Sequence, residues 1–161
     1  MKILGINDGH NAAACLYVGG HVVAAIQEER LRRIKNWSGF PIQAVRTVLE
    51  MTGTVAGEID AVAINGHYAA FPTTREQLME EYRTINDWNV VTRRAARRAV
   101  RGAIQPIGLY AAYRTHRQRQ RAAPLLRMGI PWEKITFVEH HTAHAAAAYY
   151  GRGQFTDPVL V

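Results

Sequence analysis

Two histidines stand four positions apart near the end of the sequence, His140 and His144. Four consecutive alanines follow them, and alanine has the highest helix propensity, so we expect a helix over residues 140–150. Residues four apart share one face of a helix, so the two imidazoles can reach one divalent metal ion, whereas His141 points elsewhere around the axis. Such pairs also arise by chance, and the alternative is a helix start whose histidines simply lie near a sheet edge.

A second group of residues that could do chemistry is the polar run Asp8-Gly9-His10-Asn11. It lies between two apolar stretches and predicts a tight turn. Turn amides beside a glycine can receive phosphate oxygens. Asp8 could hold a metal ion or orient a water molecule, and His10 could act as a general base or polarise a carbonyl. Aspartate, glycine and asparagine are also residues that turns prefer, so a purely structural turn is the alternative.

The segments around this turn predict an opening three-stranded sheet. Residues 2–7, 12–18 and 21–27 are β-capable, and Gly19-Gly20 between the last two indicates a hairpin. We therefore expect three antiparallel strands, with the polar turn joining the first two.

The next segments predict a crossover unit. Residues 28–41 are densely charged and end in Gly-Phe-Pro, which suggests an ordered loop with solvated side chains rather than a regular element. Pro41 suits the first turn of a helix over residues 42–51, and a strand over 61–65 follows. A strand, a helix and a further strand indicate a parallel pairing, and thus an α/β fold with a mixed sheet.

The middle of the chain is rich in arginine. Nine arginines and no acidic residue lie from Arg93 to Arg121. The rest of the chain has eleven basic and thirteen acidic residues, so the excess of positive charge is local. Helices are expected over about 74–82, 89–103 and 109–127. The basic segment could bind nucleic acid, an anionic group or an acidic part of a larger protein, or could be a solvated basic face.

The remaining features bound the class of protein. With 161 residues and 48% apolar content, the chain suits one globular domain. It has no apolar run long enough for a membrane span, no signal-peptide pattern and a single cysteine, Cys15, which together favour a soluble cytoplasmic protein. A strand over 135–138 leads into the histidine helix, and the apolar run 159–161 begins a strand that the sequence does not complete, which suggests a truncated polypeptide.

Four stretches, taken together and in this order, resemble the carbamoyltransferase family that includes the nodulation-factor and antibiotic O-carbamoyltransferases. They are Ile3-Leu4-Gly5-Ile6 through Gly9-His10-Asn11-Ala12, Glu28-Glu29-Arg30 with Arg33 and Lys35, Gly39-Phe40-Pro41, and Glu139-His140-His141-Thr142-Ala143-His144-Ala145. The poorest match is the arginine-rich middle. The resemblance implies that residues 1–161 are the first lobe of an actin/hexokinase-like (RNase H-like) domain, truncated in mid-domain, with residues 68–127 as a helical arginine-rich insertion.

The resemblance also implies a chemistry. The family makes carbamoyl-adenylate from carbamoyl phosphate and ATP in a later domain, and transfers the carbamoyl group to a hydroxyl or amine of a small-molecule acceptor at a metal. His140 and His144 would be ligands of Fe²⁺ or a similar ion. The loop of Asp8, Gly9, His10, Asn11 and Ala12 would bind phosphate, with His10 at the carbamoyl group or the acceptor hydroxyl.

Two departures from the family pattern limit what this chain can do alone. Ala13 stands where the family often has serine. The family's carboxylate metal ligand, its next phosphate loop and its adenylate-forming domain lie beyond Val161, so we expect the chain by itself to be inactive. An ATP-dependent phosphotransferase or ATPase that uses Asp8-Gly9, and a nucleic-acid-binding module built on the arginines, are the alternative functions.

Overall fold

The computed structural model describes residues 1–67 and 109–151, together with seven isolated residues between these ranges, namely 83, 86, 88, 91, 92, 95 and 99. The predicted helices over 74–82 and 89–103, the final strand over 159–161 and five of the nine arginines of the basic segment fall outside this description, apart from the isolated positions. No helix within the described part of the chain is both long and apolar enough to cross a bilayer.

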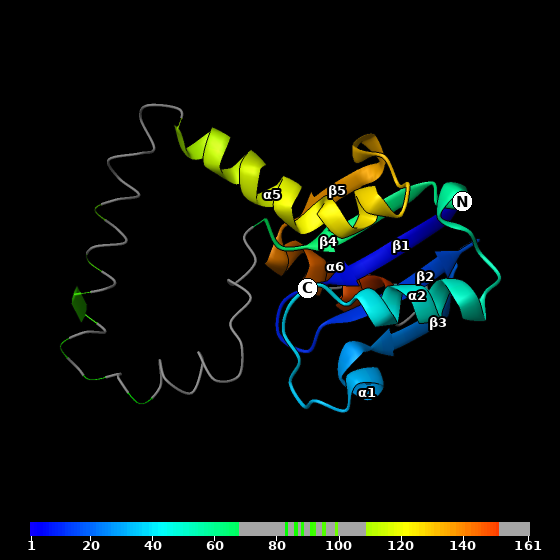
Figure 1. Ribbon diagram of the computed structural model, residues 1–161, viewed down its shortest axis with the longest axis horizontal. Helices are drawn as coiled ribbons and strands as arrows, with labels where there is room; N and C mark the ends of the chain where they lie inside the picture. The colour runs from blue at the N-terminus through cyan, green and yellow to red at the C-terminus, as the bar shows by residue number, and fades with distance from the viewer. Residues whose placement is uncertain are drawn as a thin grey trace.

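In the described part of the chain, five strands form one mixed sheet in the order β3-β2-β1-β4-β5 (Figure 1). β1 pairs antiparallel with β2, and β2 with β3, whereas β4 lies parallel to both β1 and β5. The three opening antiparallel strands and the parallel crossover predicted from the sequence are therefore confirmed. The strands are β1 (Lys2–Asn7), β2 (Ala13–Val18), β3 (His21–Gln27), β4 (Ala61–Asn65) and β5 (Ile135–Val138).

The hairpin between β2 and β3 depends on its two glycines. Gly19 and Gly20 have φ values of 59° and 99°, which L side chains rarely adopt. Two positive φ angles in a row suit the two-residue hairpin turns whose twist matches that of the flanking strands. The register that pairs Val18 with His21 follows from this turn.

The helices confirm three of the predicted segments, residues 42–51, 109–127 and 140–150, and add one that was not predicted. Short 3₁₀ turns precede β4 and β5, at Ala56–Glu58 and Trp132–Lys134. Within the described residues, the helices are α1 (Glu28–Arg32), α2 (Ile42–Met51), α5 (Leu109–Arg127) and α6 (His140–Tyr150).

One face of the sheet carries the hydrophobic core. Alternate strand residues such as Leu4 and Ile64 point to this face and are fully buried. α2 and the second half of α5 cover it, with Val48 and Leu125 fully buried, and the first half of α5 extends away from the sheet (Figure 1). α6 lies on the opposite face. The parallel strands are thus flanked by helices on both sides, which leaves their carboxyl ends as the exposed edge.

Glu28 corrects the prediction for residues 28–41. That segment begins with the helix α1, and the Glu28 side chain is 0% exposed rather than solvated. Its carboxylate accepts hydrogen bonds from the Gln43 and Ala44 amides at 3.2 and 2.7 Å, and from Arg32 Nε at 2.6 Å. Pro41 at the start of α2 has no side-chain acceptor, so Glu28 satisfies the amides that a helix N-terminus leaves free.

We expect Glu28→Ala to lower the free energy of unfolding by about 2–3 kcal/mol, because it leaves two helix amides and Arg32 without a buried acceptor. Urea unfolding followed by circular dichroism measures this change. Glu50→Gln, an exposed glutamate on α2 itself, is the matched control and should change stability little. Equal losses in the two variants would contradict the capping role.

Candidate active site at the carboxyl edge of the parallel strands

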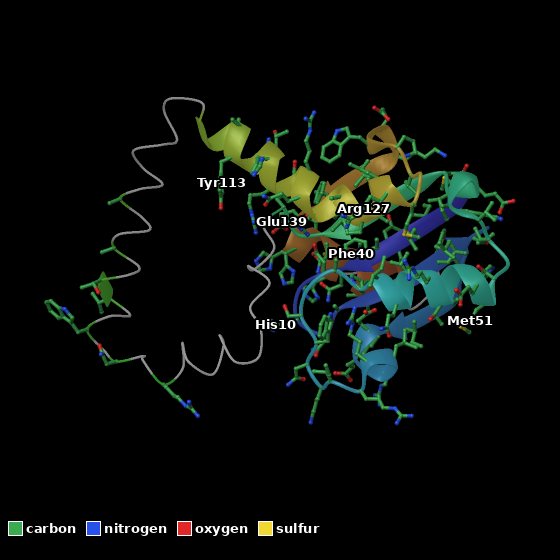
Figure 2. The ribbon with its side chains drawn as sticks, in the orientation of Figure 1. His10, Phe40, Met51, Tyr113, Arg127 and Glu139 are labelled. Carbon is green, nitrogen blue, oxygen red and sulfur yellow. The ribbon has the colours of Figure 1, made fainter. Side chains whose placement is uncertain are left out.

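The carboxyl ends of β1, β4 and β5 meet at one edge of the sheet, because these strands run parallel. β1 leads into the opening turn with His10, β4 ends at Asn65-Gly66, and β5 leads directly into α6. Figure 2 shows His10 and Glu139 on this side of the molecule. The fold thus brings the two groups singled out in the sequence to the edge where α/β sheets bind their ligands.

The opening turn is organised by the side chain of Asn7. Asn7 Nδ2 donates to the His10 carbonyl at 2.8 Å, and Asn7 Oδ1 accepts from the Gly9 amide at 3.3 Å. Asn11 adopts a left-handed φ of 53°, which asparagine tolerates better than most residues. The imidazole of His10 is left exposed at the surface. The turn is therefore a fixed support for a free histidine side chain.

The segment that follows α1 holds the turn from its other side. The Gly39 amide donates to the Asp8 carbonyl at 3.2 Å, and the Ala12 amide donates to the Trp37 carbonyl at 3.1 Å. His10 and Ser38 form an isolated antiparallel bridge. Two amides of the predicted phosphate loop, those of Gly9 and Ala12, therefore already have protein acceptors. Phosphate binding by residues 8–12 stays a prediction that depends on the other amides.

The Asp8 side chain is buried against α5. Asp8 and Arg121 are 5% and 8% exposed, and two hydrogen bonds of 2.7 Å join the guanidinium to the two carboxylate oxygens. Each oxygen accepts one hydrogen bond from Arg121 and keeps a second lone pair, so the role of Asp8 as a holder of metal or water stays a prediction. Asp8 also fixes the base of the turn that carries His10.

Arg121 also corrects the interpretation of the arginine-rich segment as a solvated basic face. It lies on α5 beside Ala122 and Leu125, which are both fully buried in the core. Arg114 and Arg119 on the same helix are exposed, as that interpretation expects. A signal was present in the sequence, because Arg121 and Leu125 stand four apart on one helical face. The end of the segment 68–127 thus packs into the core. That residues 68–127 form an insertion within the lobe stays a prediction.

His140 and His144 lie side by side on the first turns of α6. Their Nε2 atoms are 3.2 Å apart and their rings are nearly perpendicular, with centroids separated by 4.5 Å. Two nitrogens about 2.1 Å from one ion, at an angle of roughly 100°, would be about 3.2 Å apart, so the separation suits a shared metal as well as the hydrogen bond that joins the two rings here. Among residues 1–67 and 109–151, no group of three metal-binding side chains forms. This part of the chain therefore offers two ligands.

Glu139 fixes the start of the histidine helix. Its carboxylate accepts a hydrogen bond of 2.9 Å from the Thr142 amide, the arrangement of a helix N-cap. The same hydrogen bond lowers the pKa of Glu139 below its ordinary value. The cap thereby fixes where α6 begins, at His140.

A cleft of about 800 Å³ lies between α6 and the sheet face opposite the core. Small side chains at alternate strand positions form its floor, His144 lines it from α6, and Asn7, Asn65 and Arg30 contribute polar groups. This cleft was not predicted, although the alternation of small residues was a visible signal of a face left open. The floor residues are Gly5, Ala13, Cys15 and Ala25.

Comparison with known proteins adds independent information. A family model described as "Carbamoyltransferase N-terminus" matches residues 2–159. An uncharacterized protein of Synechocystis sp., sll1178, is 30% identical over 153 residues, which cover 92% of this chain and 23% of that protein. The nodulation protein NolNO of Sinorhizobium fredii is 26% identical over 140 residues, covering 87% of this chain and 17% of NolNO. An uncharacterized 19.2 kDa protein of Rhizobium etli is 31% identical over 127 residues, covering 76% and 73%.

We expect Gly5→Ala to destabilise the protein, because an alanine Cβ at this position would lie 2.6 Å from Cys15 Sγ. The loss should be about 1–3 kcal/mol, and it should shrink when Cys15 is also replaced by alanine. Urea unfolding of both single variants and the double variant measures this coupling. Gly57→Ala, where a Cβ meets no atom within 4 Å, is the control. An identical cost for Gly5→Ala with and without Cys15 would show that the two do not clash.

The cysteine in the cleft floor should react slowly. Burial raises the pKa of the Cys15 thiol, and a hydrogen bond with the Gly5 backbone opposes this only in part. Since the thiolate is the reactive form, iodoacetamide should label the folded chain more slowly than the urea-unfolded chain at neutral pH, and the folded rate should rise at higher pH. The same shift favours the folded state below the unfolded thiol's pKa, and this contribution is lost as pH rises through the folded pKa. If the labelling rate depended on pH in the same way in folded and unfolded chains, the raised pKa of Cys15 would be contradicted.

Proposed function

The chain belongs to the carbamoyltransferase family, and we propose that it supplies half of a metal site at which a carbamoyl group passes to a small-molecule acceptor. The observation that carries the proposal is the 3.2 Å separation of the two Nε2 atoms of His140 and His144, at the sheet edge that also presents His10. Fe²⁺ or a similar divalent ion is the proposed occupant. When bound, such an ion would polarise the carbamoyl carbonyl as a Lewis acid.

The proposed donor is carbamoyl-adenylate, formed elsewhere from carbamoyl phosphate and ATP. The acceptor's hydroxyl or amine attacks the carbamoyl carbon, a new carbon–oxygen or carbon–nitrogen bond forms, and AMP leaves with its phosphate oxygen. The exposed imidazole of His10 takes the proton that the acceptor loses. The opening turn, residues 8–12, is the proposed contact for a phosphate of the donor.

The proposed architecture is the first lobe of an actin/hexokinase-like domain. Three antiparallel strands followed by two parallel ones, with helices on both faces, support this assignment. The chain spans less than a quarter of the length of sll1178 and of NolNO. The third metal ligand, the second phosphate loop and the adenylate-forming domain are accordingly proposed to lie in the remainder of such a protein. The cytoplasmic location and the boundaries of the arginine-rich insertion stay predictions.

The alternative functions make different demands on the same residues. A phosphotransferase or ATPase would need phosphate release from ATP without carbamoyl phosphate. A nucleic-acid-binding module would need its arginines at the surface; Arg121 is held inside by Asp8, whereas Arg114 and Arg119 are exposed. The family match favours carbamoyl transfer over both.

Removal of either histidine should weaken metal binding. We expect His140→Ala and His144→Ala each to lower the affinity for Fe²⁺ by about tenfold or more, since loss of even an outer-shell partner costs roughly 10–100-fold. Anaerobic titration of the chain with Fe²⁺, followed by calorimetry, measures the affinity. His141→Ala, on the same turn of α6, is the matched control and should bind as the wild type does. Equal binding by all four proteins, or no binding by the wild type, would contradict the proposed site.

A further inference from the structure

Arg121 joins parts of the candidate site that are far apart in the sequence. Besides its two bonds to Asp8, 113 residues away, its Nη1 donates to the Gly66 carbonyl at 2.6 Å and its Nη2 to the Asn65 carbonyl at 2.8 Å. Its guanidinium carbon also lies 4.9 Å from the centroid of the Phe137 ring on β5. One side chain thus contacts residues at the ends of all three parallel strands.

One set of contacts leads from Arg121 to His10. The Asp8 carboxylate fixes the residue where the opening turn begins. Asn65, whose carbonyl accepts from Arg121, donates through its Nδ2 to Asn7 Oδ1 at 3.3 Å. Asn7 in turn donates to the His10 carbonyl at 2.8 Å. Arg121 therefore supports the His10 turn by two routes, one through a side chain and one through β4.

A second set of contacts leads from Arg121 to the histidine pair. Gly66, whose carbonyl accepts from Arg121, donates its own amide to the Val138 carbonyl at 2.7 Å. Val138 is the last residue of β5, and it is followed by Glu139, the N-cap of α6. Gly66 has a φ of 78°, a conformation that favours glycine, so both its carbonyl and its amide are available for these contacts. The start of α6 is thereby tied to Arg121 through one residue.

We propose that Arg121 is a positioning residue that couples the His10 turn to the metal-binding end of α6. The geometry needs arginine, because a planar guanidinium spreads its donors over a carboxylate and two carbonyls at once, whereas a lysine ammonium concentrates three donors at one point. The significance of the coupling for catalysis rests on the proposed function. The physical coupling itself does not, because it depends only on contacts within the chain.

The ring signals of the histidines report both halves of the site without metal or substrate. In a ¹⁵N-labelled chain, we expect Arg121→Lys to shift the ring signals of His10 and of the pair His140 and His144, while those of His21 at the far end of β3 stay unchanged. Asp8→Asn keeps the guanidinium bonds to the two carbonyls, so it should shift His10 more than the pair. Arg114→Lys, the same change at an exposed position of α5, is the control and should shift none of them.

Unchanged signals of His140 and His144 in Arg121→Lys would overturn the coupling, as would equal shifts in every histidine including His21. If Arg121→Lys does not fold, the double variant Asp8→Leu/Arg121→Met removes both buried charges together, which proteins tolerate better than loss of one partner. It should shift the same histidines, and its failure to do so would equally reject the proposal. A chain with coupled histidines that binds no Fe²⁺ would count against the proposed function alone.

Discussion

A carboxylate and a guanidinium buried in contact set the arrangement of everything at the carboxyl edge of this sheet. Burying either charge alone is costly, and the cost is offset only when the geometry is good and the remaining polar atoms are also satisfied. Asp8 and Arg121 meet both conditions, because the fork geometry engages both carboxylate oxygens and the other donors reach backbone carbonyls. The pair therefore connects the turn after β1 with the last residues of β4.

Local patterns in the sequence were sufficient for most of the fold. Runs of β-capable residues between turn residues identified all five described strands, and helix propensity with start and stop signals placed α2, α5 and α6. The two clear failures, Glu28 and Arg121, share a cause. Both are charged residues within charge-rich stretches, where exposure is the ordinary outcome, and their partners lie 16 and 113 residues away. Helical spacing places Arg121 on the same face as Leu125, but no local pattern identifies a partner so far away in the sequence.

The candidate site likewise has parts that local sequence patterns predict and parts that depend on distant contacts. The histidine pair was predictable because its two members are neighbours on one helix, and His10 because it stands in a recognisable turn. That these groups share one edge follows from the parallel pairing of β1, β4 and β5. The support behind them could not be predicted, because it depends on a helix that is far from β1 in the sequence, with Arg121 lying 113 residues after Asp8. The alternation of small residues signalled an open face, but the cleft under α6 depends on the strand register that brings those residues side by side.

The burial of Glu28 has a consequence for the order of folding. Every contact of its carboxylate falls within 16 residues, so the opening sheet, α1 and α2 can assemble from local interactions alone. Asp8 cannot be buried cheaply until Arg121 arrives from much later in the chain. We therefore expect the turn that is synthesised first to reach its native state after the hairpin beside it. Pulsed hydrogen exchange would show this as late protection of the Gly39 amide, which donates to the Asp8 carbonyl, relative to the Ala44 amide at the start of α2. Simultaneous protection of the two amides would exclude this order.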